Sequence, residues 1–221
     1  MSTVTLFSGG LTRLDAHGQW SGIYKQPIAT AQLTVEGLTG DRQADRRVHG
    51  GPEKALHQFA VSSYTRLAAL FPALAGQLLV GSIGENVSAD GFDEENVCIG
   101  DIFRLGEARV QVSQPRSPCW KINHRYGTSG VARAIAEHGC CGWYFRVLDT
   151  AQVNSGDELR LLERAPAAVS LGEFLRVWRA HRPEAAALER LASAPGLTAG
   201  WVKKLRERQQ WLQRNAALPG I

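Results

Sequence analysis

Short β-like runs separated by glycine turns extend from the start of the chain to about residue 164. Residues 31–38 alternate apolar and polar side chains, and residues 96–114 read as three strands joined by a Gly-Asp and a Gly-Glu turn. Residues 142–149 and 157–163 are two further strand candidates. Many short strands with glycine-rich turns are typical of a β-barrel or a sandwich. The pattern therefore predicts a mainly β fold over residues 1–164.

Two helices are expected to interrupt these strands. One runs from Ser62 towards Phe71 and stops at Pro72, because proline disfavours a helical conformation in the residue before it. The other begins near Ser129 and ends at Gly139, since glycine is the usual residue just past the end of a helix. We therefore expect a β core with a few helices.

The pattern changes to helical periodicity after about residue 165. Ser170 and Glu173 form a capping-box pattern that opens a first helix. A Pro-Gly pair ends a second helix, and Thr198 can cap a third. We therefore predict two domains, a β-barrel domain over residues 1–164 and a small three-helix domain over residues 165–221.

Basic charge is concentrated in the C-terminal part of the chain. Residues 165–221 contain nine Lys and Arg against four Asp and Glu, whereas residues 1–164 contain sixteen against seventeen. A basic helical segment raises the hypothesis of a nucleic-acid-binding module over residues 170–214. That segment lacks a stacking platform and a recognition motif, so we do not expect nucleic acid as a partner. Helix packing or a dock for an acidic partner is the simpler interpretation.

The sequence shows no targeting, membrane or disulfide signal. No apolar run approaches the roughly 20 residues of a membrane helix, and the first residues lack the features of a signal peptide. The four cysteines form no Cys-x-x-Cys pair, which indicates neither a disulfide framework nor a zinc knuckle. These observations predict a cytoplasmic location without membrane association.

One cysteine stands in an unusual setting, the stretch "VSQPRSPCWKIN". Arg116 and Lys121 flank Cys119, and nearby cations lower the pKa of a thiol. Pro115 and Pro118 stiffen the backbone around it. A thiolate so placed can act as a nucleophile or a soft metal ligand, whereas the alternative is a buried cysteine that only fills space. The segment alone leaves both interpretations open.

A cationic cluster lies in residues 40–60. It holds four cations and two histidines around Gly50–Gly51–Pro52: Arg42, Arg46, Arg47, Lys54, His49 and His57. A Gly-Gly step lets backbone amides approach an anion, and Arg and Lys suit a phosphate. The alternative is a charged surface turn whose arginines pair with nearby aspartates. A zinc site from Cys119, His49 and His57 is conceivable, but the spacing matches no familiar pattern.

Two polar residues elsewhere are further candidates. Asn86 follows a Gly-Glu pair at the expected start of a strand, and its amide can bind the edge of a heterocycle. Lys25 lies between an aromatic residue and a proline, in a place suited to the mouth of a cleft. A turn-stabilising asparagine and a solvated loop lysine are the simpler readings of the two positions.

Four motifs, taken in order, resemble the MOSC domain, the fold shared with the C-terminal part of molybdenum-cofactor sulfurases. They are "GIYKQPI", "GDRQADRRVHGGPEKAL", "GENV" and "PRSPCWKIN". The basic helical tail resembles the three-helix extension of MOSC proteins of the YiiM type. The resemblance implies a barrel-like core that binds the pterin molybdenum cofactor. It also implies two-electron reduction of N-hydroxylated compounds, including N-hydroxylated purines and other base analogues, to the amines.

The same resemblance assigns roles to residues of this chain. Cys119 matches the cysteine that serves as the molybdenum ligand. Apart from the resemblance, His49 or His57 could deliver a proton, because imidazole titrates near neutrality; the alternative for either is a structural histidine bonded to the backbone. The residues implied in binding the phosphate and the pterin are Arg47, His49, Arg116 and Lys121, with Lys25, Lys54 and Asn86 as further candidates. A soft thiolate suits a molybdenum centre, and cations suit the phosphate, so the chemistry of these residues agrees with the resemblance.

The sequence also departs from some relatives. It has no Cys-x4-Cys-x2-Cys run for an iron–sulfur cluster, so we expect electrons from a separate reductase, a flavoprotein. It has no pyridoxal-phosphate domain, so cysteine desulfuration is not expected. The leading hypothesis is a molybdenum-dependent oxidoreductase. The alternative is a non-catalytic carrier of the cofactor or a sulfur-handling protein that uses the same pocket.

Overall fold

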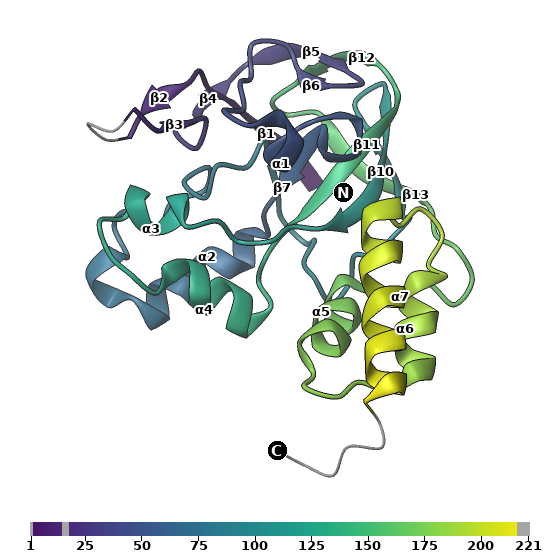
Figure 1. The fold of residues 1–221 in the computed structure, drawn as a ribbon. Helices are drawn as coiled ribbons and strands as arrows, with labels where there is room; N and C mark the ends of the chain where they lie inside the picture. The colour runs from purple at the N-terminus through teal and green to yellow at the C-terminus, as the bar shows by residue number, and fades with distance from the viewer. Residues whose placement is uncertain (1, 15–17, 216–221) are drawn as a thin grey trace.

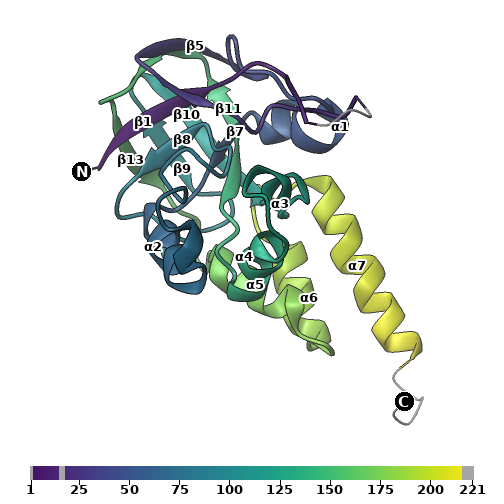
Figure 2. The same cartoon turned by 90° about the vertical axis from the view of Figure 1, so that its left-hand side faces the viewer.

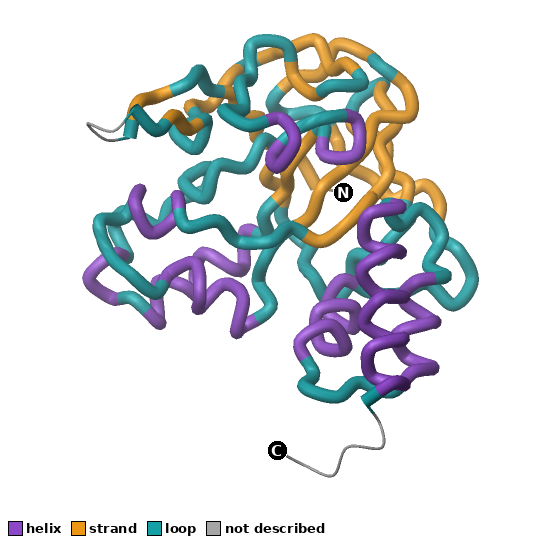
Figure 3. The backbone as a smooth tube through the Cα atoms, viewed as in Figure 1, coloured by secondary structure: helices purple, strands orange, loops and turns teal. Residues whose placement is uncertain are grey.

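The centre of the molecule is a closed β-barrel. The computed structural model describes residues 2–14 and 18–215. Within these residues the barrel strands follow the order β13-β9-β10-β11-β7-β8-β1, and the ring closes because β1 pairs with both β8 and β13. The strands are β1 (Ser2–Ser8), β7 (Leu56–Gln58), β8 (Val87–Ala89), β9 (Ile102–Leu105), β10 (Ala108–Pro115), β11 (Trp143–Asp149) and β13 (Glu158–Glu163). They gather in the upper part of Figure 1 and are orange in Figure 3. The predicted mainly β core is confirmed.

Smaller strands surround the barrel. β4 (Gln26–Ile28) extends the sheet beyond β1. β12 (Ala151–Asn154), β5 (Thr30–Thr34) and β6 (Gly37–Leu38) form a three-stranded sheet. β2 (Thr12–Arg13) and β3 (Trp20–Ser21) form a separate hairpin. The single strand expected over residues 31–38 is therefore two short strands. Of the three strands expected over residues 96–114, the second and third are β9 and β10, and the first is only an isolated bridge between Cys98 and Ser170.

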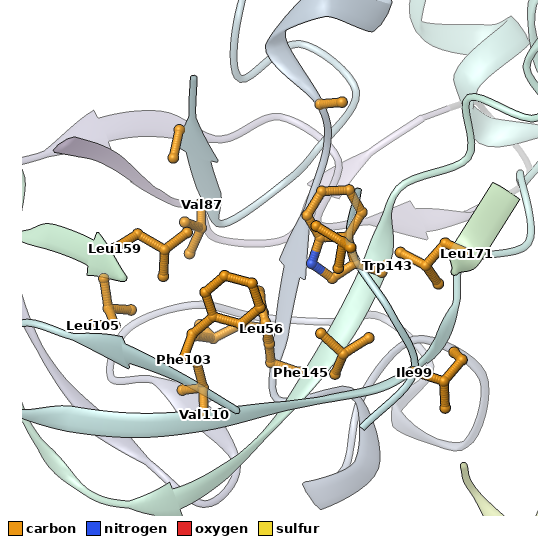
Figure 4. Close-up of a cluster of buried hydrophobic side chains, with 14 of the residues drawn as sticks. Leu56, Val87, Ile99, Phe103, Leu105, Val110, Trp143, Phe145, Leu159 and Leu171 are labelled. Carbon is orange, nitrogen blue, oxygen red and sulfur yellow. The ribbon is translucent and has the colours of Figure 1, made fainter. Parts of the chain in front are cut away.

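Alternating side chains fill the barrel. In β1, Val4 and Leu6 are buried while Thr3 and Thr5, which alternate with them, are exposed, as the two-residue period of a strand requires. Figure 4 shows the buried cluster, in which the rings of Phe103 and Phe145 meet edge to face at 5.8 Å and those of Trp143 and Phe145 at 6.4 Å. Such aromatic pairs add to the free energy gained by burying apolar surface.

The described part of residues 1–164 contains four helices: α1 (Arg46–His49), α2 (Val61–Leu70), α3 (Lys121–Arg125) and α4 (Val131–His138). Short 3₁₀ turns occupy Pro52–Lys54 and Pro72–Leu74. The expected helices α2 and α4 are confirmed. Phe71 ends α2 just before Pro72, and Gly139 ends α4 with a φ of 67°. α1 and α3 were not predicted, because helices of four or five residues are too short to show helical periodicity in the sequence.

Three helices follow the last barrel strand: α5 (Leu171–Arg179), α6 (Ala185–Ala192) and α7 (Ala199–Arg214). The Ser170 hydroxyl accepts the backbone N–H of Glu173 at 3.0 Å, so the predicted N-cap of α5 is confirmed. Thr198 is the N-cap residue of α7, as predicted, but its side chain does not cap the helix. Its hydroxyl makes no capping bond and lies 3.1 Å from the side-chain oxygen of Gln114 on β10, which fixes the start of α7 to the barrel.

The three helices share the hydrophobic core of the barrel. Phe174, Leu188, Trp201 and Leu205 belong to one buried cluster with the barrel side chains. Figure 2 shows the helices extending from one side of the strands. The predicted domain division near residue 165 falls between β13 and α5, and it stays a prediction. None of the helices in the described part of the chain combines the length and the apolar character that crossing a membrane requires.

Candidate functional site

A pocket opens where segments far apart in the sequence meet. The space between its walls is about 600 Å³, a volume that includes open solvent at the mouth. Its walls come from parts of residues 21–25, 41–57, 83–86 and 116–121, with Tyr144 of β11. These segments leave or enter strands of one barrel, so the closed sheet brings them to the same place.

Most of the predicted site residues line this pocket. The predicted cofactor-binding residues that line it are Lys25, His49, Lys54, Asn86, Arg116, Cys119 and Lys121. His57, considered as a proton donor, also lines it. Residues spread over almost one hundred positions therefore share one site.

Arg47 is placed differently from what we expected. Asp45 caps α1 and accepts the backbone N–H of Arg47 at 3.0 Å, and the same carboxylate pairs with the Arg47 guanidinium at 3.1 Å. The Arg47 side chain is 90% exposed. The helix cap thus directs this arginine to solvent, and it is not among the residues that line the pocket.

Cys119 lies in an irregular segment between β10 and α3. β10 ends at Pro115, and α3 begins at Lys121, just after the segment. The backbone N–H of Ile122 bonds to the Cys119 carbonyl at 3.0 Å and fixes the start of the turn. The thiol is free, half-buried and part of the pocket wall. Cys119 is therefore not the fully buried, space-filling cysteine that was the alternative interpretation of its sequence.

The pocket wall has a large excess of positive charge. Among the described residues it includes five Lys and Arg side chains, namely Lys25, Arg42, Lys54, Arg116 and Lys121. The one carboxylate that lines the described wall is that of Asp41. Cations gathered in a concave site raise the local concentration of anions and bind phosphate and carboxylate groups strongly. The site is therefore built for an anionic ligand.

Asp41 organises the deep part of the wall. Its carboxylate pairs with the ammonium of Lys25, and only 2% and 5% of the two side chains are exposed. Burial lowers the pKa of Lys25, and the charge of Asp41 opposes that effect. The amide of Asn86 donates to Asp41 at 3.0 Å and to the Phe7 carbonyl at 3.2 Å, and it accepts the His57 backbone N–H at 3.2 Å. These bonds favour the structural reading of Asn86.

Two side chains of the wall have a buried nitrogen atom without a hydrogen-bond partner, Nη1 of Arg116 and Nε2 of His57. Nη2 of Arg116 donates to the Ile83 carbonyl at the long distance of 3.4 Å. Leaving such a group unpaired costs about 1–3 kcal/mol, and native proteins keep few of them. A ligand in this pocket is the natural partner for both atoms.

Neither histidine is suited to deliver a proton as imidazolium near neutral pH. Burial, together with the charges of Arg116 and Lys121, lowers the pKa of His49 to about 4. Burial also holds the pKa of His57 well below its usual range. Both rings are neutral at pH 7, so the expectation that one of them is the acid is not supported. A bound anion would oppose the cations around His49 and raise its pKa.

Comparison with known proteins shows the family. A family model described as the MOSC domain matches residues 45–160. The chain belongs to the MOSC domain family. It is 39% identical to the protein YiiM of Escherichia coli (strain K12) over 87% of this chain and 86% of that protein. The crystal structure of YiiM from Escherichia coli matches with a TM-score of 0.80 and 31% identity, covering 95% of this chain and 92% of the other. The resemblance to YiiM-type MOSC proteins is confirmed.

Another relative is a longer chain. A protein named "Reductase" from Gibberella moniliformis (strain M3125 / FGSC 7600) is 38% identical over 162 residues. The match covers 72% of this chain but only 29% of that protein. The region shared with this MOSC protein is therefore one part of a larger polypeptide there.

Three ionisable residues of the MOSC pocket were not among the predicted site residues: Asp41, Arg42 and Tyr144. Arg42 stands in the cationic cluster of the sequence, so its composition was a usable signal. Tyr144 stands in a predicted strand, where an aromatic residue looks like core. Burial raises the pKa of its phenol, and the nearby Arg116 guanidinium opposes that rise. Only the fold shows that Tyr144 reaches the pocket.

A zinc site gains no support. The part of the chain that the structure describes contains no group of three or more His, Cys, Asp and Glu side chains arranged to hold a metal ion. The pocket instead offers one thiol among cations, which fits a metal that arrives with its own chelating ligand rather than a free divalent ion.

The vicinal cysteines are part of a second core. Cys140 and Cys141 are buried in a cluster with Ile135 and Tyr126, and burial raises the pKa of their thiols to about 11 and about 12. Both thiols are therefore protonated and inert at neutral pH. Cys140→Ala and Cys141→Ala should each lower the free energy of unfolding by about 1 kcal/mol and leave activity near that of the wild type. Urea denaturation and a turnover assay check this, and an inactive alanine variant would contradict it.

Glu94 ties the back of the pocket to the C-terminal helices. Its carboxylate accepts the backbone N–H of Gly142 at 2.7 Å, and its carbonyl accepts that of Gly172 in α5. The Gly142 carbonyl in turn accepts the backbone N–H of Arg116 at 3.0 Å. Burial raises the pKa of Glu94 to about 7, while the bond from Gly142 opposes the rise.

The raised pKa of Glu94 predicts that the free energy of unfolding depends on pH. A carboxyl whose pKa is higher in the folded than in the unfolded state destabilises the fold as pH rises from about 4.5 to 7, because ionisation then favours the unfolded chain. Glu94→Gln keeps an acceptor for Gly142 but cannot ionise. It should raise the free energy of unfolding by about 2–3 kcal/mol at pH 8 and change it little at pH 5. Urea denaturation at both pH values measures the difference, with the exposed Glu95→Gln as control. An equal effect at the two pH values would refute this assignment.

Proposed function

We propose that this MOSC protein binds the molybdenum cofactor in the pocket and reduces N-hydroxylated compounds, such as N-hydroxylated purines, to the amines. One observation carries the proposal. The wall that holds the free Cys119 thiol also holds five cations among its described residues and two buried nitrogen atoms without partners. A soft ligand beside an anion site matches a cofactor that combines a soft metal with a phosphate.

The chemistry of the donor set fits this group. A thiolate is a good ligand for molybdenum, and Cys119 is the one thiol that lines the described part of the pocket. The phosphate and the polar edge of the pterin need cations and donors. Arg116 offers an unpartnered N–H for such an oxygen, and Lys54 and Lys121 add charge at the same wall.

The cofactor, when bound, supplies two-electron oxidation and reduction, and the side chains of this chain supply the rest. Cys119 holds the metal. Arg116 and the lysines hold the anionic groups, and neutral His49 can donate or accept a hydrogen bond at the same wall. Overall, R–NHOH takes up two electrons and two protons and yields R–NH₂ and water. The electrons come from a separate flavoprotein reductase, which this proposal includes as a partner.

The relatives support the oxidoreductase class. MOSC domains are associated with binding of the molybdenum cofactor, and one relative that shares most of this chain is named "Reductase". A pocket without turnover, as in a cofactor carrier, would present the same residues. Turnover is therefore the property that separates the two functions.

The test uses protein purified from a host that makes the cofactor. The protein is given a chemical reductant and an N-hydroxylated purine, and the amine product is measured by chromatography. The proposal expects amine at many turnovers per chain, and none from protein made in a host that lacks the cofactor. Protein that carries molybdenum but forms no amine would be a carrier, and the proposed reductase function would be wrong.

A further inference from the structure

The outer side of α7 carries an excess of positive charge. This helix contains five Lys and Arg side chains but one carboxylate, that of Glu207. Arg208 is used inside the molecule, where its guanidinium donates to backbone carbonyls at the end of α5. Three of the remaining cations lie close together in the sequence and are exposed: Lys203, Lys204 and Arg206.

These three cations differ from those of the neighbouring helix α5 and of α6. There, Arg176 and Arg190 each pair with a carboxylate, at 2.9 and 2.8 Å. Among the residues that the structure describes, Lys204 and Arg206 make no ion pair, and Lys203 approaches the carboxylate of α7 only to 3.9 Å. The exposed cations of α7 are therefore available to the carboxylates of another molecule.

An open hollow in the surface lies among these cations. Leu197, Ala199 and Val202 line it together with Lys203 and Arg206. Protein interfaces combine an apolar centre with a polar rim, and encounters between redox proteins bury less than about 1,200 Å² in total. A helix face with apolar side chains beside exposed cations is therefore suited to a small interface with an acidic protein.

The start of α7 is fixed close to the wall of the pocket. Ser113 of β10 connects the two, because its hydroxyl donates to the Glu53 carbonyl at 2.6 Å and its carbonyl accepts the backbone N–H of Thr198 at 3.2 Å. Glu53 directly precedes Lys54, which lines the pocket. Burial lowers the pKa of Lys54, and the charge of Lys204 lowers it as well. Figures 1 and 2 both show the first turn of α7 close to α1. A partner on α7 therefore stands beside the site.

We propose that the exposed face of α7 docks an acidic surface of the flavoprotein that supplies the electrons. This inference rests on the proposed function, because only a reductase needs such a donor. Oxidation of one fully reduced flavin supplies the two electrons and two protons that convert R–NHOH into R–NH₂ and water. The cations of α7 and of the pocket wall attract the same acidic partner and speed its encounter with the site. A nucleic acid offers the same charge but no apolar side chain for the hollow.

The experiment compares two electron donors, dithionite and reduced flavodoxin, a small acidic FMN protein. The wild type and a variant with Lys204→Glu and Arg206→Glu are loaded with cofactor and assayed with an N-hydroxylated purine. The α7 variant should lose about 10-fold in rate with flavodoxin at low salt and keep its rate with dithionite. The control variant combines Arg133→Glu with Arg160→Glu. It changes the net charge equally, at exposed positions on α4 and β13 that line neither the pocket nor the hollow.

A binding measurement separates this inference from the proposed function. Oxidised flavodoxin is titrated into each loaded protein in a calorimeter, at low and at high salt. The wild type and the control variant should bind it at low salt and lose it at high salt, and the α7 variant should bind about 10-fold more weakly.

The outcomes separate the two proposals. Binding of this kind, with no amine formed from either donor, would support the docking face and overturn the reductase. Amine formed with dithionite, but no response to flavodoxin or equal responses of the wild type and the α7 variant, would overturn the docking face and leave the reductase standing. A DNA duplex that displaces flavodoxin from the wild type but does not bind the α7 variant would assign the face to nucleic acid instead.

Discussion

Cys119→Ser should abolish reduction of N-hydroxylated substrates while the protein stays folded. Oxygen in place of sulfur removes the soft ligand, and we expect kcat to fall by more than about 100-fold, since even groups that only support a metal ligand contribute 10- to 100-fold. The fold should tolerate the change, because Cys119 is half-buried and its segment is held by Pro115, by Pro118 and by the bond from Ile122 to the Cys119 carbonyl.

Turnover and thermal unfolding together check this prediction. The free energy of unfolding of the serine variant should stay within about 0.5 kcal/mol of the wild type. Cys140→Ala is the matched control, because it removes a thiol that lies outside the pocket. A serine variant with wild-type turnover would show that the sulfur of residue 119 is not the ligand. A serine variant that unfolds would show that its role is structural.

Arg116→Met should weaken binding of the cofactor without lowering the free energy of unfolding. The guanidinium is buried, has one nitrogen without a partner and makes one long hydrogen bond. Removing a buried, poorly paired charge in favour of an apolar side chain of similar length is often neutral or stabilising. Removing it from an anion site is costly, and a lost buried charge contact is worth about 2–5 kcal/mol. We therefore expect cofactor affinity to fall by about 100-fold while the free energy of unfolding holds or rises.

The exposed arginine supplies the control. Arg47→Met removes an arginine of the same cationic sequence cluster, but one that points to solvent and pairs with Asp45. It should retain the cofactor through gel filtration as the wild type does, whereas Arg116→Met should lose it. Equal retention by the two variants, or equal loss, would contradict the pocket geometry. Urea denaturation of both variants measures the other half of the prediction.

The parts of the fold that local chemistry determines were predictable from the sequence. Glycine turns divide the strands, Pro72 and Gly139 end two helices, and the Ser170 hydroxyl caps α5 as its pattern indicates. Thr198 shows the limit of such rules. It has the right residue type for a cap, but a nearby side chain of β10 offers its hydroxyl a different partner. Tertiary contacts decide between equally good local choices.

The short barrel strands were harder to predict for the same reason. β7 and β8 are three residues each, too short for alternation to show, and they exist because neighbouring strands supply their hydrogen-bond partners. Barrel closure through β1 and β13 joins the two ends of the barrel domain. Nothing in the sequence of β1 or of β13 indicates that these two strands pair.

Most residues of the site could be predicted from the sequence, but the orientation of Arg47 and the protonation state of His49 could not. The order of the motifs led to Cys119, Arg116, Lys25 and Lys121, and the fold brings these residues to one pocket. The sequence could not tell that Asp45 turns Arg47 outwards. It could not show that burial, together with the charges of Arg116 and Lys121, keeps His49 neutral, because both effects depend on the folded structure.

The central claim is that this pocket holds the molybdenum cofactor beside Cys119. The most direct measurement is the molybdenum and pterin content of the chain purified from a host that makes the cofactor. We predict about one molybdenum atom per chain, together with the pterin. A chain that carries neither, from cells whose other molybdenum enzymes are fully loaded, would contradict the claim.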